Sequence, residues 1–366
     1  MVHALAERHE VSTLTATPWS PQEANAFYGT AIPDDRVTRR VIPPPLSWLA
    51  RLPEHRGNRL RLCSVLRYAR PLADRFDLMV TADNYGAFAR PGIQYLHFPA
   101  ALQPVPTRLA PVVNLYFAFC DWLIGMPWTA AAANLTLANS QWTAAGLARL
   151  YPGGDKPSGL STVLYPPVLD PGEGESWARR SNTFLCIGRF HGSKRIEIAM
   201  SIVRRIRAEV IPHARLVIVG SAVDAEYTRR LHRLAAQDRD WIDFHEDLSR
   251  ADLNVLMGRC RYGIQAMEYE HFGMAAAEMT RAGCIVFSHA SGGSVEVVDH
   301  DPRLLWRTEA DAVALVAAVA RDDALRDAIG ARLRTHSTTF STGRFVNQFN
   351  DIVDDWERRH LRHHVS

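Results

Sequence analysis

The sequence predicts an α/β protein with two domains, each built around a doubly wound parallel sheet. Three observations lead to this class. Apolar strand segments and helical segments alternate without a break from residue 183 to residue 282. Prolines and glycines gather at residues 166–174 and mark a linker near the middle of the chain. The length of 366 residues is sufficient for two domains with a core each.

The composition narrows the class of protein. The hydrophobic share of 47% and the charged share of 22% are ordinary for a soluble globular chain, and a net charge of +3 is too small to indicate a nucleic-acid partner. Five scattered cysteines without a C-x-x-C spacing indicate reduced core thiols, so we expect a cytoplasmic protein without a signal peptide. The most apolar stretch, 109–126, contains Asn114 and Asp121, which favours a buried or interfacial helix over a membrane span.

The first half is expected to alternate between strands and helices. The segment 49–70 carries many arginines among leucines. It predicts a basic amphipathic helix that either contacts an anionic membrane or exposes a solvated face. Ser140 is expected to cap a helix. The other expected elements are a helix at 1–8, strands at 11–16, 36–42, 77–82, 93–99, 135–139 and 162–165, and a helix at 140–150.

The second half is expected to form the longer parallel sheet. Its strands are expected at 183–187, 216–219, 242–245, 262–265 and 285–288, and its helices at 194–208, 224–236, 250–257, 274–282, 311–319, 323–333 and 344–359. We therefore place the domains at 1–168 and 182–343, with a linker at 169–181 and a closing helix at 344–366.

Two carboxylates, Glu270 and Glu278, stand eight positions apart around a predicted helix start. Gly273 is free to adopt a tight turn, and 274–279 has the composition of the first turns of a helix. A helix start presents unpaired N–H groups and a partial positive charge, which suits a diphosphate. One acid can then meet a sugar hydroxyl while the other meets a ribose. A capping acid and a surface acid are the alternative interpretation of this pattern alone.

The residues that follow this motif resemble a known family. Behind the E-x7-E element come a Gly cap at Gly283, a buried strand, and the S-G-G loop at 291–293 with Glu296 beyond it. This order resembles the retaining glycosyltransferases of family 4. The E-H-F-G and S-G-G wording is most similar to the α-1,2-mannosyltransferases that extend dolichol-linked oligosaccharides. The resemblance covers nearly the whole chain. It implies the GT-B architecture, with two Rossmann-like domains facing a cleft and a last helix that crosses back to the first domain.

The loop at 188–194 carries two cations, Arg189 and Lys194, on either side of Gly192. Both can fold onto one diphosphate, whose negative charge grows as the sugar leaves. Two solvated surface cations are the alternative, and the E-x7-E loop expected at the same sheet edge favours the functional interpretation. The resemblance assigns Arg189 and Lys194 to the diphosphate, Glu270 to a donor-sugar hydroxyl, Glu278 to the ribose, and the backbone N–H groups of Phe272, Gly273 and Met274 to the sugar or phosphate.

Two residues of the first domain are expected at the carboxyl ends of strands, where sites form in open α/β sheets. His97 leaves the strand at 93–99, and its L-H-F-P setting resembles the H-Y-P of the mannosyltransferases. We predict that it faces the sugar or the acceptor. Asp83 follows the strand at 77–82 and is either an acceptor-side residue or a cap.

Two D-x-D triplets, at 238–240 and 299–301, suggest a divalent metal ion. The first follows a predicted helix and the second a short loop, so both are interpreted as turns. Because the cationic loop already supplies positive charge, no metal and no other cofactor is expected.

Together with these features, the resemblance implies a retaining, metal-independent glycosyltransferase that moves a hexose to a glycan or lipid-linked acceptor. The E-H-F-G wording that the chain shares with the mannosyltransferases favours mannose from GDP-mannose as the donor. A UDP-sugar donor, an epimerase-type protein and a non-catalytic sugar-nucleotide-binding protein of the same architecture are the alternatives. The expected partners are the donor, the acceptor and a peripheral membrane contact through 51–70, without nucleic acid. The expected location is the cytoplasm, at the inner face of the membrane where that contact forms.

The start of the sequence departs from the family that it resembles. There, a strand and a Gly-rich loop precede the first helix, and both are missing here, either because the start codon is assigned late or because the chain is truncated. The strand at 11–16 is therefore expected to lack a neighbour on its central side. We expect a chain that starts about 15–20 residues upstream to be more stable and more active.

Overall fold

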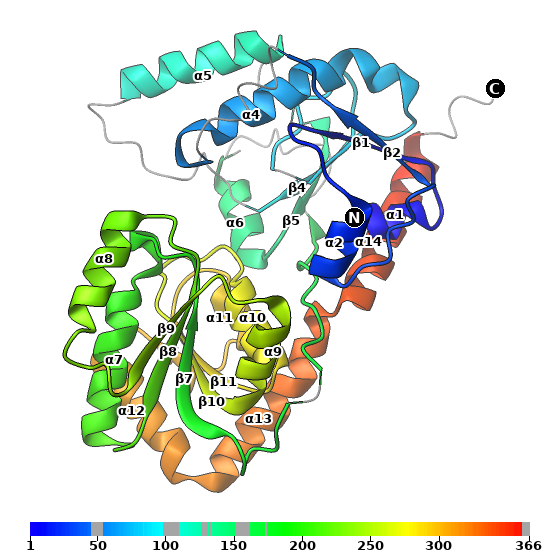
Figure 1. Ribbon diagram of the computed structural model, residues 1–366. Coiled ribbons are helices and arrows are strands. Elements are labelled where there is room, and N and C mark those ends of the chain that lie inside the picture. The colour runs from blue at the N-terminus through cyan, green and yellow to red at the C-terminus, as the bar shows by residue number, and fades with distance from the viewer. Residues whose placement is uncertain are drawn as a thin grey trace. The chain divides into compact units, whose positions relative to one another are not determined.

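A computed structural model describes the chain over residues 1–44, 54–82, 84–97, 110–125, 131, 133–150, 162–172 and 174–360. The chain divides into two compact units: Met1–Leu164 with Phe345 onward, and Tyr165–Arg344 (Figure 1). Each unit contains a parallel sheet accompanied by helices, which confirms the predicted α/β class.

The second unit is built on a six-stranded parallel sheet in the order β12-β11-β10-β7-β8-β9. Figure 1 shows α7 and α8 on one face of this sheet and α9 and α10 on the other. Strands that are covered on both faces need apolar side chains in nearly every position. The strands of this unit could therefore be predicted from the sequence. The strands are β7 (Ser181–Ile187), β8 (Arg215–Gly220), β9 (Ile242–Glu246), β10 (Cys260–Gln265), β11 (Ile285–His289) and β12 (Leu305–Trp306). The helices are α7 (Ile196–Glu209), α8 (Ala225–Leu234), α9 (Arg250–Arg259), α10 (Met274–Arg281), α11 (Ser294–Val297), α12 (Glu309–Arg321) and α13 (Asp323–Ser337).

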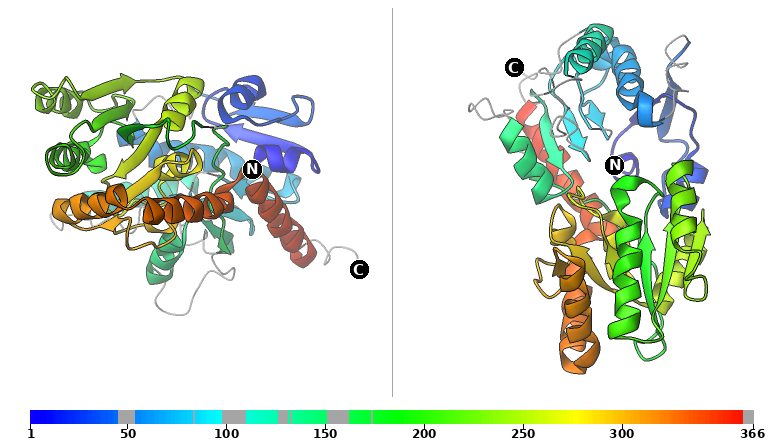
Figure 2. Two further views of the ribbon diagram at one scale, coloured as in Figure 1. Left: turned by 90° about the horizontal axis from the view of Figure 1, so that it is seen from below. Right: turned by 90° about the vertical axis from the view of Figure 1, so that its left-hand side faces the viewer.

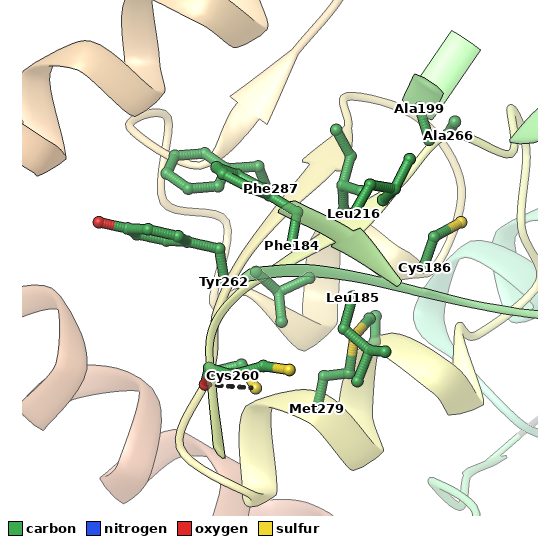
Figure 3. Close-up of a cluster of buried hydrophobic side chains, with 14 of the residues drawn as sticks. Phe184, Leu185, Cys186, Ala199, Leu216, Cys260, Tyr262, Ala266, Met279 and Phe287 are labelled. Atoms are coloured by element: carbon green, nitrogen blue, oxygen red, sulfur yellow. Dashed lines mark hydrogen bonds between the residues drawn. The ribbon is translucent and has the colours of Figure 1, made fainter. Parts of the chain in front are cut away.

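The core of the second unit lies on both faces of the central strand β7. Figure 3 shows Phe184, Tyr262 and Phe287 on one face of the sheet, and Leu185 with Met279 of α10 on the other. The rings of Phe184 and Tyr262 are stacked, with centroids 4.7 Å apart. Burying aromatic side chains of this size stabilises a domain by about 1.5–3 kcal/mol each.

The segment that the sequence suggested as a linker, 169–181, lies within the second unit. Arg180 is buried, and its guanidinium donates hydrogen bonds to the carbonyl oxygens of Cys260 at 3.0 Å and Ala282 at 2.6 Å. A buried cation that satisfies carbonyl groups after α9 and α10 joins this segment to the sheet.

The first unit contains two separate parallel sheets, in the orders β3-β4-β5-β6 and β1-β2. The strands are β1 (Val11–Thr15), β2 (Val37–Val41), β3 (Val80–Thr81), β4 (Ile93–Leu96), β5 (Leu135–Ala138) and β6 (Thr162–Val163). All six predicted strands exist, but β3 and β6 are only two residues long. β1 pairs with β2 along its whole length, and the two strands form a sheet of their own.

The helices of this unit are α1 (Val2–Ala6), α2 (Pro21–Tyr28), α4 (Glu54–Ala69), the 3-10 helix η1 (Arg70–Arg75), α5 (Ala110–Ile124), α6 (Gln141–Leu150) and α14 (Thr342–His360), which begins in the other unit. The prediction missed α2, although Ser20 caps it and Gly29 ends it in the left-handed region. The N-terminal part of the predicted helix at 49–70, up to residue 53, lies outside the described residues. Within the described ranges, no helix is long and apolar enough to cross a bilayer.

The closing helix α14 completes the core of the first unit. Its buried residues Phe345, Phe349, Val353 and Trp356 recur at helical spacing on one face. This face packs in one apolar cluster with Ile93 and Tyr95 of β4.

Candidate active site

The cationic loop leaves the carboxyl end of β7 and is tightly held. Gly220 of β8 approaches it so closely that a Cβ atom there would lie 1.9 Å from the carbonyl oxygen of Gly188. Phe190 is fully buried and anchors the middle of the loop. The loop then forms the 3-10 turn η5 (Gly192–Lys194) and reaches Arg195, which has a φ of 51°. The ordered backbone presents the side chains of Lys194 and Arg195 beyond the end of the sheet.

The loop that carries Glu270 lies against the S-G-G loop that follows β11. The N–H of Gly293 donates to the carbonyl oxygen of Glu270 at 2.6 Å, and Glu270 pairs with Gly292 in an isolated parallel bridge. A Cβ atom on Gly292 would lie 2.3 Å from the Glu270 carbonyl oxygen, and one on Gly293 would lie 2.2 Å from that of His271. Only glycine fits at these two positions, so the S-G-G sequence sets the position of Glu270.

Lys194 and Glu270 form an ion pair at the centre of the candidate site. The Nζ atom of Lys194 lies 2.5 Å from Oε2 of Glu270, and the side chains are 24% and 14% exposed. Gln265, the last residue of β10, donates a second hydrogen bond to the same oxygen at 3.3 Å. Two residues that the sequence singled out 76 positions apart are therefore in contact. Both side chains keep part of their surface accessible to a ligand.

A second group of charged side chains lies beside this pair, and the sequence analysis did not identify it. Arg195 donates to Glu268, and Oε1 of Glu268 lies 3.7 Å from Nε2 of His289. Burial lowers the pKa of His289, which the Glu268 carboxylate opposes. Burial also lowers the pKa of His271, which Glu270 opposes. Both imidazoles are neutral near pH 7, so the positive charge of the site comes from its lysine and arginines.

Helix α10 begins directly behind the Glu270 loop. Gly273, its N-cap, has a φ of 101° and provides no capping side chain, and the first turn contains no acidic residue. The N–H groups of that turn have no acceptor within the helix and carry the positive end of its dipole. Met274 is 42% exposed at this end. Phe272 is 2% exposed and packs against Tyr165 and Phe340, so its side chain is structural and only its backbone is available to a ligand.

Glu278 lies in the middle of α10, with its side chain 13% exposed. Its Oε1 accepts a hydrogen bond from the guanidinium of Arg250, the first residue of α9, at 2.8 Å. Burial raises the pKa of Glu278, and the charge and hydrogen bond of Arg250 oppose that rise. Sequence reasoning missed Arg250, because 28 residues separate the partners and no motif links them.

Arg189 is exposed, and its guanidinium has no hydrogen-bond or ion-pair partner among the residues that the structure describes. The structure therefore does not join Arg189 to Lys194 or Glu270. Its role at a diphosphate stays a prediction.

His97 lies at the carboxyl end of β4, in the first unit, and is exposed. Its Nε2 atom is 3.0 Å from the carbonyl oxygen of Ala82, and its backbone N–H donates to Oδ1 of Asn84. The ring meets Tyr95 edge to face, with centroids 4.5 Å apart. These contacts orient the imidazole at the end of the strand. Asp83 lies outside the described residues.

The carboxylates of both D-x-D triplets form ion pairs with arginines. Asp238 pairs with Arg204, Asp240 with Arg207, Asp299 with Arg332, and Asp301 with Arg303. Each triplet begins in or beside a turn, as expected. Among the described residues, no three His, Cys, Asp or Glu side chains are grouped as metal ligands would be.

The second unit matches a known protein family. Residues 173–335 match the family model described as glycosyl transferases group 1. The chain is 29% identical over 204 residues to the GDP-Man:Man(3)GlcNAc(2)-PP-Dol alpha-1,2-mannosyltransferase of Neurospora crassa, a match that covers 47% of this chain and 36% of the relative. It is 22% identical over 204 residues to the human protein of the same name, covering 52% of this chain and 40% of that protein. The chain thus spans well under half the length of these relatives.

Solved structures share the fold over nearly the whole chain. Sucrose-phosphate synthase from Thermosynechococcus elongatus aligns with a TM-score of 0.68 at 17% identity, over 98% of this chain and 92% of that one. WaaG, a glycosyltransferase involved in lipopolysaccharide biosynthesis, aligns with a TM-score of 0.67 at 14% identity, over 95% of this chain and 92% of that one. These likenesses confirm the predicted fold class.

Proposed function

We infer the function from two premises: residues 173–335 are a glycosyltransferase group 1 domain, and the fold is that of the GT-B glycosyltransferases. We propose that the chain is a retaining hexosyltransferase that moves mannose from GDP-mannose to a glycan or lipid-linked acceptor. The relatives named above are GDP-mannose-dependent α-1,2-mannosyltransferases. Their α-linked product keeps the α configuration of the donor, which supports retention.

The observation that carries the proposal is the Lys194–Glu270 pair beside the start of α10. In glycosyl transfer the bond from the sugar C1 to the diphosphate oxygen breaks, and negative charge develops on the diphosphate. An ammonium group and unpaired N–H groups at a helix start are suited to stabilise that charge. The exposed Arg189 offers a second cation, with a bidentate fork, from the same loop.

The two acids are proposed to bind different parts of the donor. Glu270 accepts a hydrogen bond from a hydroxyl of the sugar. The ammonium group of Lys194 then interacts with both Glu270 and the diphosphate. Glu278 accepts hydrogen bonds from the ribose, while Arg250 keeps its carboxylate ionised and oriented. Backbone N–H groups of Gly273 and Met274 complete the anion site.

Transfer is proposed to proceed on one face of the sugar. The acceptor oxygen forms a bond to C1 as the diphosphate leaves, and the acceptor proton passes to an oxygen of the departing phosphate. This route needs neither a protein nucleophile nor a divalent ion, so we propose a metal-independent reaction without a cofactor. His97 is the proposed residue of the first unit that meets the sugar or the acceptor, and Asp83 is the second candidate.

The proposed location is the cytoplasm, because all five cysteines are free and buried as in a reducing compartment. A lipid-linked acceptor requires contact with a membrane. The basic segment 51–70, of which Arg61 and Arg67 lie on the described part of α4, is proposed to contribute to it.

The test is a transfer assay with radiolabelled GDP-mannose and an extract of lipid-linked oligosaccharides. We expect Lys194→Met and Glu270→Gln to lose activity by about 100-fold or more, since each removes charge stabilisation at the reacting centre. Arg205→Met removes a cation of α7 whose side chain is 40% exposed and pairs with Glu209, and it should retain full activity. Product formed from a UDP-sugar alone, or a donor rearranged without an acceptor, would contradict the proposal.

A further inference from the structure

Helix α5 exposes an apolar face that has no role in the proposed transfer reaction. The exposed fractions are 67% for Val112, 73% for Leu115, 47% for Phe119 and 73% for Trp122. Their spacing of three, four and three residues places them in one row along about 15 Å of helix. The rings of Phe119 and Trp122 also touch, with centroids 5.7 Å apart. We call these four residues the α5 stripe.

The opposite face of α5 is already occupied. Cys120 and Ile124 are fully buried in an apolar cluster with Cys63 and Leu66 of α4. Figures 1 and 2 show α4 and α5 side by side. The core-facing side of α5 is therefore already packed against α4. The stripe lies on the other side of the helix and exposes large apolar side chains to solvent.

The surroundings of the stripe are cationic. The segment 54–75, which contains α4, carries six arginines and two acidic residues, whereas the only charged residue of the sequence 110–124 is Asp121. At the Trp122 end, Arg70 donates to the carbonyl oxygen of Gly125. A Cβ atom on Gly125 would lie 2.9 Å from the guanidinium of Arg67. Arginines thus stand beside the aromatic end of the stripe.

This arrangement matches the chemistry of a bilayer surface that contains anionic lipids. Aliphatic and aromatic side chains enter the boundary between headgroups and acyl chains, with Trp at the polar level, while neighbouring arginines meet lipid phosphates. A typical interfacial helix carries both an apolar face and a cationic face. Here α5 supplies the apolar face and α4 supplies the charge.

We propose that the α5 stripe is a membrane-docking surface that inserts into the interfacial region of an anionic bilayer. The inference rests on the proposed function in one respect, since a lipid-linked acceptor explains why the chain needs a membrane. It goes beyond that function by assigning the contact to α5, with the α4 arginines as its electrostatic support.

The test is cosedimentation of the full chain with vesicles of phosphatidylcholine, alone or mixed with phosphatidylglycerol. We expect binding to the mixed vesicles, and a partition coefficient lowered about tenfold or more by Leu115→Gln with Trp122→Gln, because each side chain loses its burial in lipid. Arg67→Gln should weaken binding to the mixed vesicles and reduce its salt dependence. The matched control is Val223→Gln with Val255→Gln, which alters two valines of the second unit that are 51% and 52% exposed.

Two outcomes would overturn the inference. One is equal vesicle binding by the wild type and the Leu115, Trp122 variant. The other is a dimer in light scattering that this variant dissociates, since the stripe would then be a protein interface. Calorimetric titration with GDP-mannose on the same proteins tests the proposed function separately. Absent donor binding would overturn that function and leave the vesicle result standing.

Discussion

Replacing Arg250 with methionine tests the electrostatics of the candidate site most directly. Glu278 is 13% exposed and Arg250 is 29% exposed, and their atoms meet at 2.8 Å. Methionine keeps much of the apolar volume but leaves the carboxylate without its partner. Breaking a fully buried ion pair costs about 3–5 kcal/mol. Because solvent still reaches Arg250, we expect a smaller loss of about 1–3 kcal/mol in the free energy of unfolding at neutral pH.

The loss should depend on pH, with a sign that follows from the burial of Glu278. Burial raises the pKa of Glu278 in the folded chain above the ordinary 4.5 of the unfolded chain, and Arg250 opposes this rise. An acid with a raised folded pKa destabilises the fold when it is ionised. Its cost is absent below the unfolded pKa, grows as the pH rises from the unfolded to the folded pKa, and is complete above the folded pKa. Arg250→Met raises the folded pKa further, so its effect should be largest at neutral pH and small at pH 4.5.

The assay is thermal unfolding of wild type, Arg250→Met, Glu278→Gln and the double variant at both pH values. A loss of 1 kcal/mol lowers the Tm of a domain of this size by about 2–4 °C. The double variant should recover most of the loss, because no unpaired carboxylate remains. Arg259→Met is the matched control at the other end of α9, where the pair with Glu175 is 64% and 40% exposed and contributes about 0–1 kcal/mol. A similar loss at both pH values, or in the control, would refute the reasoning.

Three further predictions concern the donor site. Glu278→Ala should weaken the binding of a sugar nucleotide by about 1.5–3 kcal/mol for each hydrogen bond lost to the charged carboxylate, while kcat changes less. Unchanged affinity in a calorimetric titration would argue against a role of Glu278 at the ribose. Gly293→Ala should displace the Glu270 loop and reduce kcat/KM, because its Cβ atom would lie 2.2 Å from the His271 carbonyl oxygen. Gly343→Ala at the start of α14, where a Cβ atom would meet nothing within 4 Å, should be neutral in the same assay. Transfer should survive EDTA, because Lys194 supplies the charge that a metal ion would otherwise provide; turnover lost on chelation and restored by Mn²⁺ would contradict this.

Most strands and helices of the second unit could be predicted from the sequence. The reason is that each strand of a parallel sheet covered on both faces is a short run of apolar residues. The Gly273 turn, the helix behind it and the meeting of the 188–194 and 270–278 loops at one sheet edge followed from local rules. The roles assigned to Arg189, His97 and Asp83 stay predictions. In the first unit, the strands were located correctly, but β3 and β6 are shorter than their apolar segments.

Only the tertiary structure decided which charges meet. Lys194 with Glu270, Arg195 with Glu268, and Arg250 with Glu278 join residues 76, 73 and 28 positions apart. Hydrophobic periodicity indicates which side of a helix or strand is buried. It does not indicate which residue of another element a charged side chain will contact at the sheet edge. The same limit applies to α5: its sequence predicted a buried or interfacial helix, and only packing against α4 determined which residues remain exposed. Such contacts depend on the relative positions of whole elements, which no single segment of the chain encodes.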